Sequence, residues 1–417
     1  MSRKSIAAIL AATTVSTALA VVTLTAPGAA HGTTHSAEDP APEVDHDVRF
    51  ATYNASLNRF NEGDLVRDLS TQDNRQAQKV AEIVQRTQPD VLLINEFDHV
   101  EDGRAAELFR DNYLEVSQNH APPADYPYYY VAPSNTGVPS GHDLDNSGSV
   151  GGPNDAFGFG FFPGQFGMVA YSKYPIATDE VRTFQHFLWK DMPGALLPDD
   201  PATAAPRDWY SSEELEDFRL SSKSHWDVPV EIGEETVHVL ASHPTPPVFD
   251  QAEDRNGTRN HDEIRFWADY VSGGEPASYI YDDAGEYGGL AADASFVIAG
   301  DQNSDPLDGD SIPGAIQQLL DNPRVNAGDP PTSAGASEAS RLQGGINDEH
   351  RTPARYDTAD FGDPPGNLRV DYVLPDRDRR TLAGAVYWPV LANPFSSLID
   401  ASDHRLVWVD VALRHRR

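Results

Sequence analysis

The stretch that most constrains this chain runs from Phe296 to Pro306, with the sequence Phe-Val-Ile-Ala-Gly-Asp-Gln-Asn-Ser-Asp-Pro. Its four leading apolar residues predict a short buried strand, which Gly300 ends. Asp301 and Asn303 follow at the carboxyl end of the strand, and because side chains alternate, they share one face. One interpretation is a polar turn that closes a strand. The other is a site for a hard metal ion and a phosphate, since an anionic oxygen and a neutral amide stand together.

The amino-terminal part of the chain predicts a strand, a helix and a second strand. Residues 48–54 alternate in character and end at Asn54, and residues 75–88 carry apolar side chains at helical spacing. The aliphatic run 91–94 predicts a buried strand that ends in Asn95 and Glu96. A carboxylate is costly to bury unpaired, so we expect Glu96 at a rim or holding a cation. Polar residues at the ends of such strands are typical of an α/β site.

Other predicted strands also carry a charged or polar residue at or near an end. His243 ends one strand, Asp371 lies within another, and Asp403 and His404 precede the last. Each residue alone fits a structural role, but their repeated occurrence at strand ends predicts a common site. The further predicted strands are residues 167–172, 223–230, 236–243, 368–374 and 406–411, and the further predicted helices are 260–271 and 314–320.

Long polar segments separate these elements. Residues 134–167, 191–222 and 326–366 are rich in Gly, Pro, Ser or Asp, and we predict all three as loops. In the first of them Asp143 and Asp145 are candidate calcium ligands, together with His142 and Asn146, but their spacing matches no standard calcium loop. Since no repeat and no dividing linker is visible, we predict one domain with long insertions.

Charge and cysteine content exclude several classes of protein. With 31 basic and 65 acidic residues the formal net charge is −34, which disfavours broad non-specific binding of nucleic acid. It does not exclude a nuclease, because a metal ion supplies local positive charge. The chain has no cysteine, so disulfides, thiolate chemistry and cysteine zinc sites are excluded.

The first 30 residues have the pattern of a secretory signal peptide. Arg3 and Lys4 precede a largely apolar run, and Gly28-Ala29-Ala30 offers a cleavage site of small residues. The alternative is an uncleaved membrane anchor. We predict a disordered leader over 31–47, a folded domain over 48–412, an extracellular location and no membrane-spanning segment in the mature chain.

Five short motifs resemble those of the endonuclease/exonuclease/phosphatase superfamily, the group that includes pancreatic-type deoxyribonucleases, exonuclease III-like enzymes, inositol polyphosphate 5-phosphatases and bacterial sphingomyelinases. The resemblance covers roughly residues 48–412. It implies two mixed β-sheets packed face to face with helices outside. The motifs are Thr52-Tyr53-Asn54, Asn95-Glu96, Gly300-Asp301-Gln302-Asn303, Arg369-Val370-Asp371-Tyr372 and Ser402-Asp403-His404. At two positions the chain departs from the family pattern: Gln302 replaces an aromatic or aliphatic residue, and Asn95 replaces Gln.

The resemblance implies a role for each site residue. Glu96 is the expected principal metal ligand, with Asn54 beside it and Asp403 as an additional ligand. Asp301 would orient or deprotonate the attacking water with Asn303 as its partner, and His404, held by Asp371, would contact the scissile phosphate. His243 stands where the family has a histidine or tyrosine for the oxyanion or leaving group. Lys223 and His225 lie on the strand where some family nucleases have a phosphate-binding basic residue, and Asn260 and Arg265 on the following helix are further candidate substrate contacts. The alternative for each of the four is a solvated surface position.

Together these features predict a secreted, divalent-metal-dependent phosphoesterase that hydrolyses phosphate mono- or diesters. Oxygen ligands favour Mg²⁺, with Mn²⁺ or Ca²⁺ as alternatives. The sequence implies no stable protein partner. A nuclease acting on DNA or RNA, a sphingomyelinase-like phospholipid hydrolase and a catalytically silent binding module remain alternatives, because one fold serves many substrates.

Overall fold

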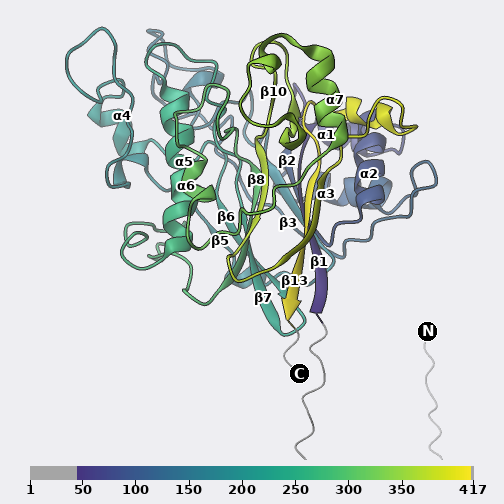
Figure 1. Ribbon diagram of the computed structural model, residues 1–417. Helices are drawn as coiled ribbons and strands as arrows, with labels where there is room; N and C mark the ends of the chain where they lie inside the picture. The colour runs from purple at the N-terminus through teal and green to yellow at the C-terminus, as the bar shows by residue number, and fades with distance from the viewer. Residues whose placement is uncertain (1–44, 415–417) are drawn as a thin grey trace, which may run out of the picture. The chain divides into compact units, whose positions relative to one another are not determined.

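The structure is a computed structural model that describes residues 45–414 (Figure 1). The predicted signal peptide and most of the predicted leader lie outside this range. The first strand, β1 (Asp45–Leu57), begins at Asp45, so the last three residues of the predicted leader already belong to it. These residues pair with the last strand, β13 (Val407–Arg414), which explains why the fold begins before residue 48.

One mixed sheet of the described region has six strands in the order β12-β13-β1-β2-β4-β3. β1 and β2 run parallel, as the strand-helix-strand pattern predicts, and the other neighbours are antiparallel. The additional strands are β2 (Val91–Phe97), β3 (Tyr128–Tyr130), β4 (Met168–Ser172) and β12 (Thr381–Val386).

The second large sheet within residues 45–414 has five strands in the order β11-β8-β7-β6-β5, with β7 and β8 parallel. A separate short ladder joins β9 to β10. The strands are β5 (Arg182–Thr183), β6 (Trp226–Ile232), β7 (Glu235–Ala241), β8 (Ser295–Asp301), β9 (Ala359–Asp360), β10 (Asn367–Leu368) and β11 (Asp371–Pro375).

The two large sheets pack face to face, and helices cover their outer faces. Alternate residues such as Phe50, Leu93, Val239 and Val297 form the core between the sheets. Figure 1 shows α2 and α3 on one side of the strands and α5 and α6 on the other. The helices are α1 (Asp64–Leu69), α2 (Arg75–Thr87), α3 (Arg104–Phe109), α4 (Ser212–Asp217), α5 (Arg255–Ser272), α6 (Gln317–Leu320) and α7 (Ala334–Gln343). This is the two-sheet α/β sandwich that the family resemblance implies.

The prediction of a loop over 191–222 is wrong at α4, and the prediction of a loop over 326–366 is wrong at α7. Helix α7 is rich in Gly, Ala and Ser and has no apolar periodicity, so its sequence gives little signal. Ser333 caps its amino terminus by accepting from Ala336 N at 3.1 Å, and Ala336 packs in the core that contains Trp388.

Several boundaries also differ from the prediction. β6 begins at Trp226, β7 ends at Ala241 so that His243 lies beyond the strand, and residues 367–375 form two strands. α5 begins at Arg255, earlier than predicted, and α6 begins at Gln317, later than predicted.

Candidate active site

The predicted site residues come from six places in the chain that meet at one edge of the sandwich. Asn54 and Glu96 lie in β1 and β2, Asp301 ends β8, and Asp371 begins β11. His243 and His404 lie on the segments that follow β7 and precede β13. Gly300 is required in β8, because its φ is 147° and a Cβ atom there would overlap the Ser242 carbonyl.

Three side-chain nitrogens surround one oxygen atom, Oδ2 of Asp301. Asn54 Nδ2 donates to it at 3.1 Å, and the Nε2 atoms of His243 and His404 lie 3.4 and 3.6 Å away. All four side chains are buried or nearly so. The structure therefore brings together a carboxylate, an amide and two imidazoles around a single point.

His404 is oriented by a second carboxylate. Its Nδ1 lies 3.0 Å from Oδ2 of Asp371, which also accepts a hydrogen bond from Thr358 Oγ1 at 2.8 Å. Thr358 Oγ1 accepts in turn from the backbone N–H groups of Val370 and Asp371. With Nδ1 engaged by Asp371, the His404 Nε2 atom is left to face Asp301.

Glu96 projects from β2 with both carboxylate oxygens held by amides. Asn54 Nδ2 donates to Oε1 at 3.1 Å and Asn58 Nδ2 donates to Oε2 at 2.8 Å. Its backbone is left-handed, with φ of 58°, a conformation that costs a non-glycine residue about 1 kcal/mol. The fold holds Glu96 in this conformation, partly exposed at the edge of the site.

Asn303 has the same left-handed backbone, with φ of 52°. Its N–H donates to Asp301 Oδ1 at 2.8 Å, and its Nδ2 donates to the Pro244 carbonyl at 3.1 Å. The second bond joins the turn after β8 to the proline-rich segment after His243. Asn303 therefore fixes both Asp301 and the neighbouring loop.

The charges of the cluster depend on one another. Burial acts to raise the pKa of Asp301, but the charge of His404 and the contacts with His243 and Asn54 lower it well below its ordinary value. Burial acts to lower the pKa of His404, but the Asp371 and Asp301 carboxylates raise it to about 10. Burial raises the pKa of Asp371 to about 6, although the His404 charge opposes this.

His243 differs from His404 in its protonation. Burial lowers the pKa of His243, and the nearby Lys223 charge adds to this effect, although Asp301 opposes it. At mildly alkaline pH the cluster therefore holds two carboxylates, a cationic His404 and a neutral His243. Such a pair of histidines can place a positive charge at a phosphate and handle a proton at another point.

The donor set suits a divalent cation. Ligand atoms of Asp301, Asp371 and His404 lie within 4.8 Å of one another, and since the cationic imidazole has no lone pair to offer, the carboxylate oxygens are the candidate ligands. Oδ1 of Asp371 is buried with no hydrogen-bond partner among the described residues. Glu96 adds a partly exposed carboxylate whose orientation is fixed. Hard oxygen donors of this kind favour Mg²⁺, Mn²⁺ or Ca²⁺ over softer metals.

The remaining predicted residues occupy different surroundings. Asp403 accepts from Ser56 Oγ at 3.4 Å near the site, and buried Lys223 reaches the Pro244 carbonyl at 3.5 Å. Asn260 donates to the Thr245 and Gln302 carbonyls, so it supports the backbone beside the site.

Two predicted substrate contacts are bound elsewhere. His225 is buried, and its ring nitrogens lie 2.9 Å from Ser221 Oγ and from the Glu263 carbonyl. Arg265 donates to Asp269 and the Pro193 carbonyl, rather than to the cluster. Their surroundings give both residues a structural role.

The structure also reveals supporting residues that the sequence did not single out. Asn58 donates a hydrogen bond to Glu96, and Thr358 donates one to Asp371. Neither residue belongs to one of the five motifs. The two departures from the family pattern are compensated locally. Asn95 Oδ1 accepts from Thr52 Oγ1 and Asp301 N, and Gln302 Nε2 donates to Ser242 Oγ.

Of the four candidate calcium ligands of the first insertion, Asp143 and Asp145 lie close together, and the third member of their cluster is Asp155. His142 and Asn146 do not belong to this cluster. Asp143 and Asp145 accept from backbone N–H groups at 147–148, and Asp155 accepts from those of residues 144 and 151. Asx turns of this kind explain the cluster as loop structure.

The sequence matches the model of the endonuclease/exonuclease/phosphatase family over residues 51–404. The chain belongs to this family. Among curated proteins the search found no match. Within residues 45–414 there is also no helix with the length and apolar character needed to cross a membrane.

Three solved structures illustrate the range of proteins that this chain is similar to. An endonuclease/exonuclease/phosphatase from Beutenbergia cavernae has 18% identity, with 88% of this chain and 72% of that chain covered and a TM-score of 0.47. Sphingomyelinase C from Streptomyces griseocarneus has 15% identity, 88% and 99% coverage and a TM-score of 0.42. Truncated TDP2 from Caenorhabditis elegans has 13% identity, 88% and 98% coverage and a TM-score of 0.38. Identities this low do not transfer a substrate between proteins.

Proposed function

We propose that this protein is a divalent-metal-dependent hydrolase of phosphate esters. The observation that carries the proposal is the convergence of Asn54, His243 and His404 on Oδ2 of Asp301. Membership of the endonuclease/exonuclease/phosphatase family supports the same reaction class. A silent binding module would have no need of two histidines in opposite protonation states around one carboxylate.

Each residue receives a role from its surroundings. Glu96 would hold the divalent metal, with Asn54 beside it orienting the Glu96 carboxylate through Nδ2. The metal would polarise a phosphoryl oxygen and stabilise the charge that develops on it. Cationic His404 donates a hydrogen bond to the phosphate, and Asp371 keeps the imidazole charged and oriented. Asn303 holds the Asp301 carboxylate in place through its backbone N–H.

Asp301 accepts a hydrogen bond from the attacking water, whose oxygen bonds to phosphorus as the ester P–O bond breaks. Its lowered pKa makes Asp301 a weak base, which favours orientation of the water over permanent removal of its proton. Neutral His243 lies 3.4 Å from the same carboxylate, where it can exchange a proton with the water or with the departing alcohol.

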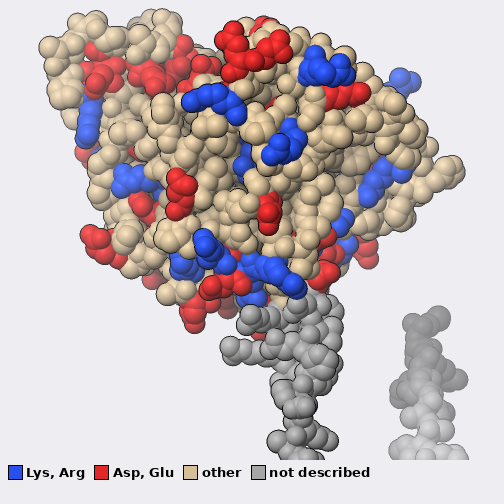
Figure 2. All heavy atoms as spheres, viewed as in Figure 1, with Lys and Arg blue, Asp and Glu red and all other residues tan. Residues whose placement is uncertain are grey.

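A small ester is the favoured substrate over a nucleic acid. The net charge of −34 repels a polyanion at long range. On the face shown in Figure 2, the Lys and Arg side chains are scattered among neutral and acidic residues and form no continuous track. Nucleic-acid binding by contrast relies on clustered basic residues.

Hydrolysis assays with magnesium, manganese or calcium test the proposal. The substrates are p-nitrophenyl phosphate, bis-p-nitrophenyl phosphate and plasmid DNA, each with and without EDTA. We expect metal-dependent release of p-nitrophenol that EDTA abolishes. Plasmid nicking as the dominant activity would identify a nuclease instead, and an absence of turnover with every metal would contradict the proposed reaction.

We further propose that the protein is exported, on the basis of the pattern in residues 1–30. Mass spectrometry of protein recovered from the culture medium of an expressing bacterium tests this, with a mature amino terminus close to residue 31 as the expected result. Recovery of the intact chain in the membrane fraction would indicate an anchor.

A further inference from the structure

A cavity of about 550 Å³ opens onto the candidate active site. Glu96, Lys223 and His243 form part of its lining, and His243 is the residue whose Nε2 lies 3.4 Å from Asp301 Oδ2. The volume is within the range of about 300–1,000 Å³ that small-molecule sites usually have. The remaining walls are largely apolar and come from Leu144, Ala156, Phe159, Phe166, Tyr210 and Phe218.

These apolar walls belong to the two insertions, 134–167 and 191–222. The buried Arg259 of α5 ties the insertions together, because its guanidinium donates to the carbonyls of Phe157, Arg219 and Leu220 at 2.5–3.0 Å. Glu263, one turn further along α5, accepts from the N–H groups of two lining residues, Ser222 and Thr245, at 2.6 Å. The pocket is therefore preformed by buried hydrogen bonds.

The lining of this pocket also contains charged side chains. These are three cationic residues, Lys223, Arg255 and Arg259, and one carboxylate, Glu96. Lys223 is 6% exposed, and the hydrogen bond that the structure gives its Nζ is a long one, 3.5 Å to the Pro244 carbonyl. Arg255 is paired with Glu253, and Arg259 donates to three backbone carbonyls. Lys223 is therefore the lining cation that an anionic group can approach.

Phe249 is one of the residues that line this pocket, and it is 86% exposed. A large apolar side chain so exposed beside an apolar cavity marks a place where a ligand can cover it. A second exposed aromatic, Phe60, is 72% exposed but does not belong to the lining; its ring contacts Phe161, with centroids 5.2 Å apart. These two residues offer a matched pair for experiment.

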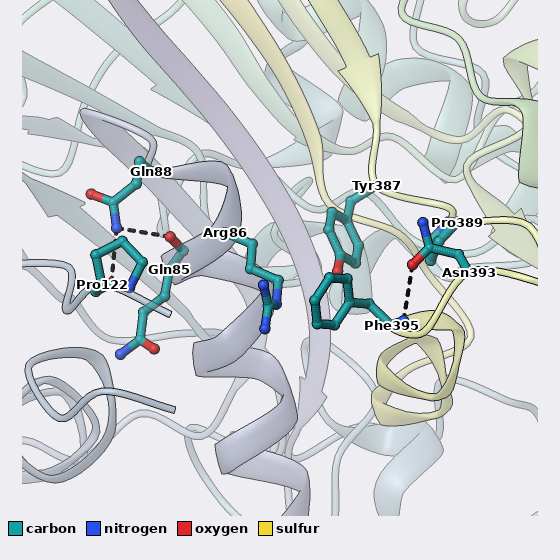
Figure 3. A pocket seen from close by; sticks show the side chains of 8 residues that line it. All are labelled: Gln85, Arg86, Gln88, Pro122, Tyr387, Pro389, Asn393 and Phe395. Carbon is teal, nitrogen blue, oxygen red and sulfur yellow. Dashed lines mark hydrogen bonds between the residues drawn. The ribbon is translucent and has the colours of Figure 1, made fainter. Parts of the chain in front are cut away.

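Another cavity, of about 400 Å³, lies between the end of α2 and segment 387–395 (Figure 3). Its cation, Arg86, stacks on Phe395 at 3.4 Å and pairs with Glu82 at 2.6 Å. An anion would have to displace Glu82, so this cavity is a poor site for an anionic ligand.

We propose that the substrate of this protein is a phosphate ester with one bulky apolar group, and that this group occupies the pocket between the two insertions. The inference rests on the proposed function, since the phosphate must lie at the Asp301–His404 cluster while the apolar group lies against Phe159, Tyr210 and Phe249. The aromatic walls would select the ester group, while His404 and a metal held by Glu96 would act on the phosphate. Specificity and chemistry are thus carried by different parts of the chain.

Binding of non-hydrolysable phosphonates tests this inference without relying on turnover. Methylphosphonate and 1-naphthylmethylphosphonate share the phosphonate group and differ in the apolar group, and calorimetry measures their affinity for the full chain with Mg²⁺. We expect the naphthyl compound to bind about 10- to 100-fold more tightly. Phe249→Ala should reduce this preference roughly three- to tenfold, and Phe60→Ala should leave it unchanged.

The possible results distinguish a failure of this inference from a failure of the proposed function. Equal affinity for the two phosphonates would overturn the inference while the phosphate site stands. A preference that depends on Phe60 rather than Phe249 would also overturn it, because the ring would then bind the outer surface. If neither compound binds, the phosphate site itself fails, and both proposals fail with it.

Co-sedimentation with phosphatidic acid vesicles identifies the source of the apolar group. Binding of the naphthyl compound without vesicle binding supports a soluble ester. Vesicle binding that is lost in Phe249→Ala and kept in Phe60→Ala supports a lipid phosphate in the same pocket. Vesicle binding lost only in Phe60→Ala contradicts the pocket as the lipid site.

Discussion

Replacing Asp371 with Asn tests how the cluster holds His404 as a cation. The substitution keeps the shape of the side chain, so Oδ1 of the amide can still accept from Nδ1 of His404, but it removes the charge. His404 Nδ1 lies 3.0 Å from Asp371 Oδ2, and at an effective dielectric constant of 20 this separation corresponds to about 5 kcal/mol of attraction. Since about 1.36 kcal/mol equals one pH unit of titration, Asp371 accounts for most of the rise to about 10.

We therefore expect the titration midpoint of His404 in Asp371→Asn to fall by roughly 2–4 pH units. Asp301, whose Oδ2 lies 3.6 Å from His404 Nε2, remains and keeps the midpoint from falling further. His404 would then be largely neutral at pH 8, and its hydrogen bond to the phosphate would lose its charge. We expect kcat/KM to fall by about 10²- to 10⁴-fold.

Nuclear magnetic resonance of histidine-labelled, EDTA-treated protein measures this midpoint directly. The chain has 14 histidines, so His404→Gln is needed to identify the signal by its disappearance. A titration midpoint near 10 in Asp371→Asn would refute the electrostatic reasoning. Activity within threefold of the wild type would show that the charge of His404 has no part in catalysis.

Three further substitutions test other parts of the account. Asn58→Ala removes the donor to Glu96 Oε2. We expect the Mn²⁺ affinity measured by calorimetry to weaken roughly tenfold. An unchanged affinity would show that Glu96 is not a metal ligand. Arg259→Met leaves three backbone carbonyls without their donor, and urea unfolding should show a loss of about 2–4 kcal/mol; a loss below about 1 kcal/mol would show that the insertions are held by other contacts. Burial and the charges of Asp305 and Asp308 raise the pKa of Asp357 to about 8 from its ordinary 3.8, so the folded state keeps a proton that the unfolded state loses between these pH values. The free energy of unfolding should thus fall as pH rises across that window. Asp357→Asn should stabilise the protein by roughly 2–5 kcal/mol at pH 9 but little at pH 4. An equal effect of the substitution at both pH values would contradict this reasoning.

The central strands were predictable because they carry strong local signals, whereas the face-to-face packing of two sheets followed from the resemblance to a known family. The aliphatic run at 91–94 and the apolar run at 296–299 each form a buried strand, and the polar residues that follow each of them lie at the site. α7 was not predictable, because a helix of Gly, Ala and Ser buries one small face against the core and leaves no periodic pattern.

The sequence predicted which residues meet at the centre of the candidate site, but not the residues that support them. Asp301, Asn303 and His404 stand in motifs at strand ends, which the sequence displays. Asn58 and Thr358 act through single hydrogen bonds across more than ten residues of chain, and nothing local distinguishes them from other polar loop residues. The place of a basic residue in a predicted strand or helix does not tell whether its side chain faces the site. Lys223 lines the pocket, whereas Arg265 binds Pro193 and Asp269.

The most direct test of the central claim is hydrolysis of bis-p-nitrophenyl and p-nitrophenyl phosphate by Asp301→Asn in the presence of magnesium. Arg265→Gln is the matched control, because it also removes one charge but its partners are Asp269 and Pro193 rather than the cluster. We predict that Asp301→Asn lowers kcat/KM by about 10³-fold or more, and that Arg265→Gln stays within about twofold of the wild type. Retention of wild-type activity by Asp301→Asn would contradict the account, because the atom on which Asn54, His243 and His404 converge would then play no part in the reaction.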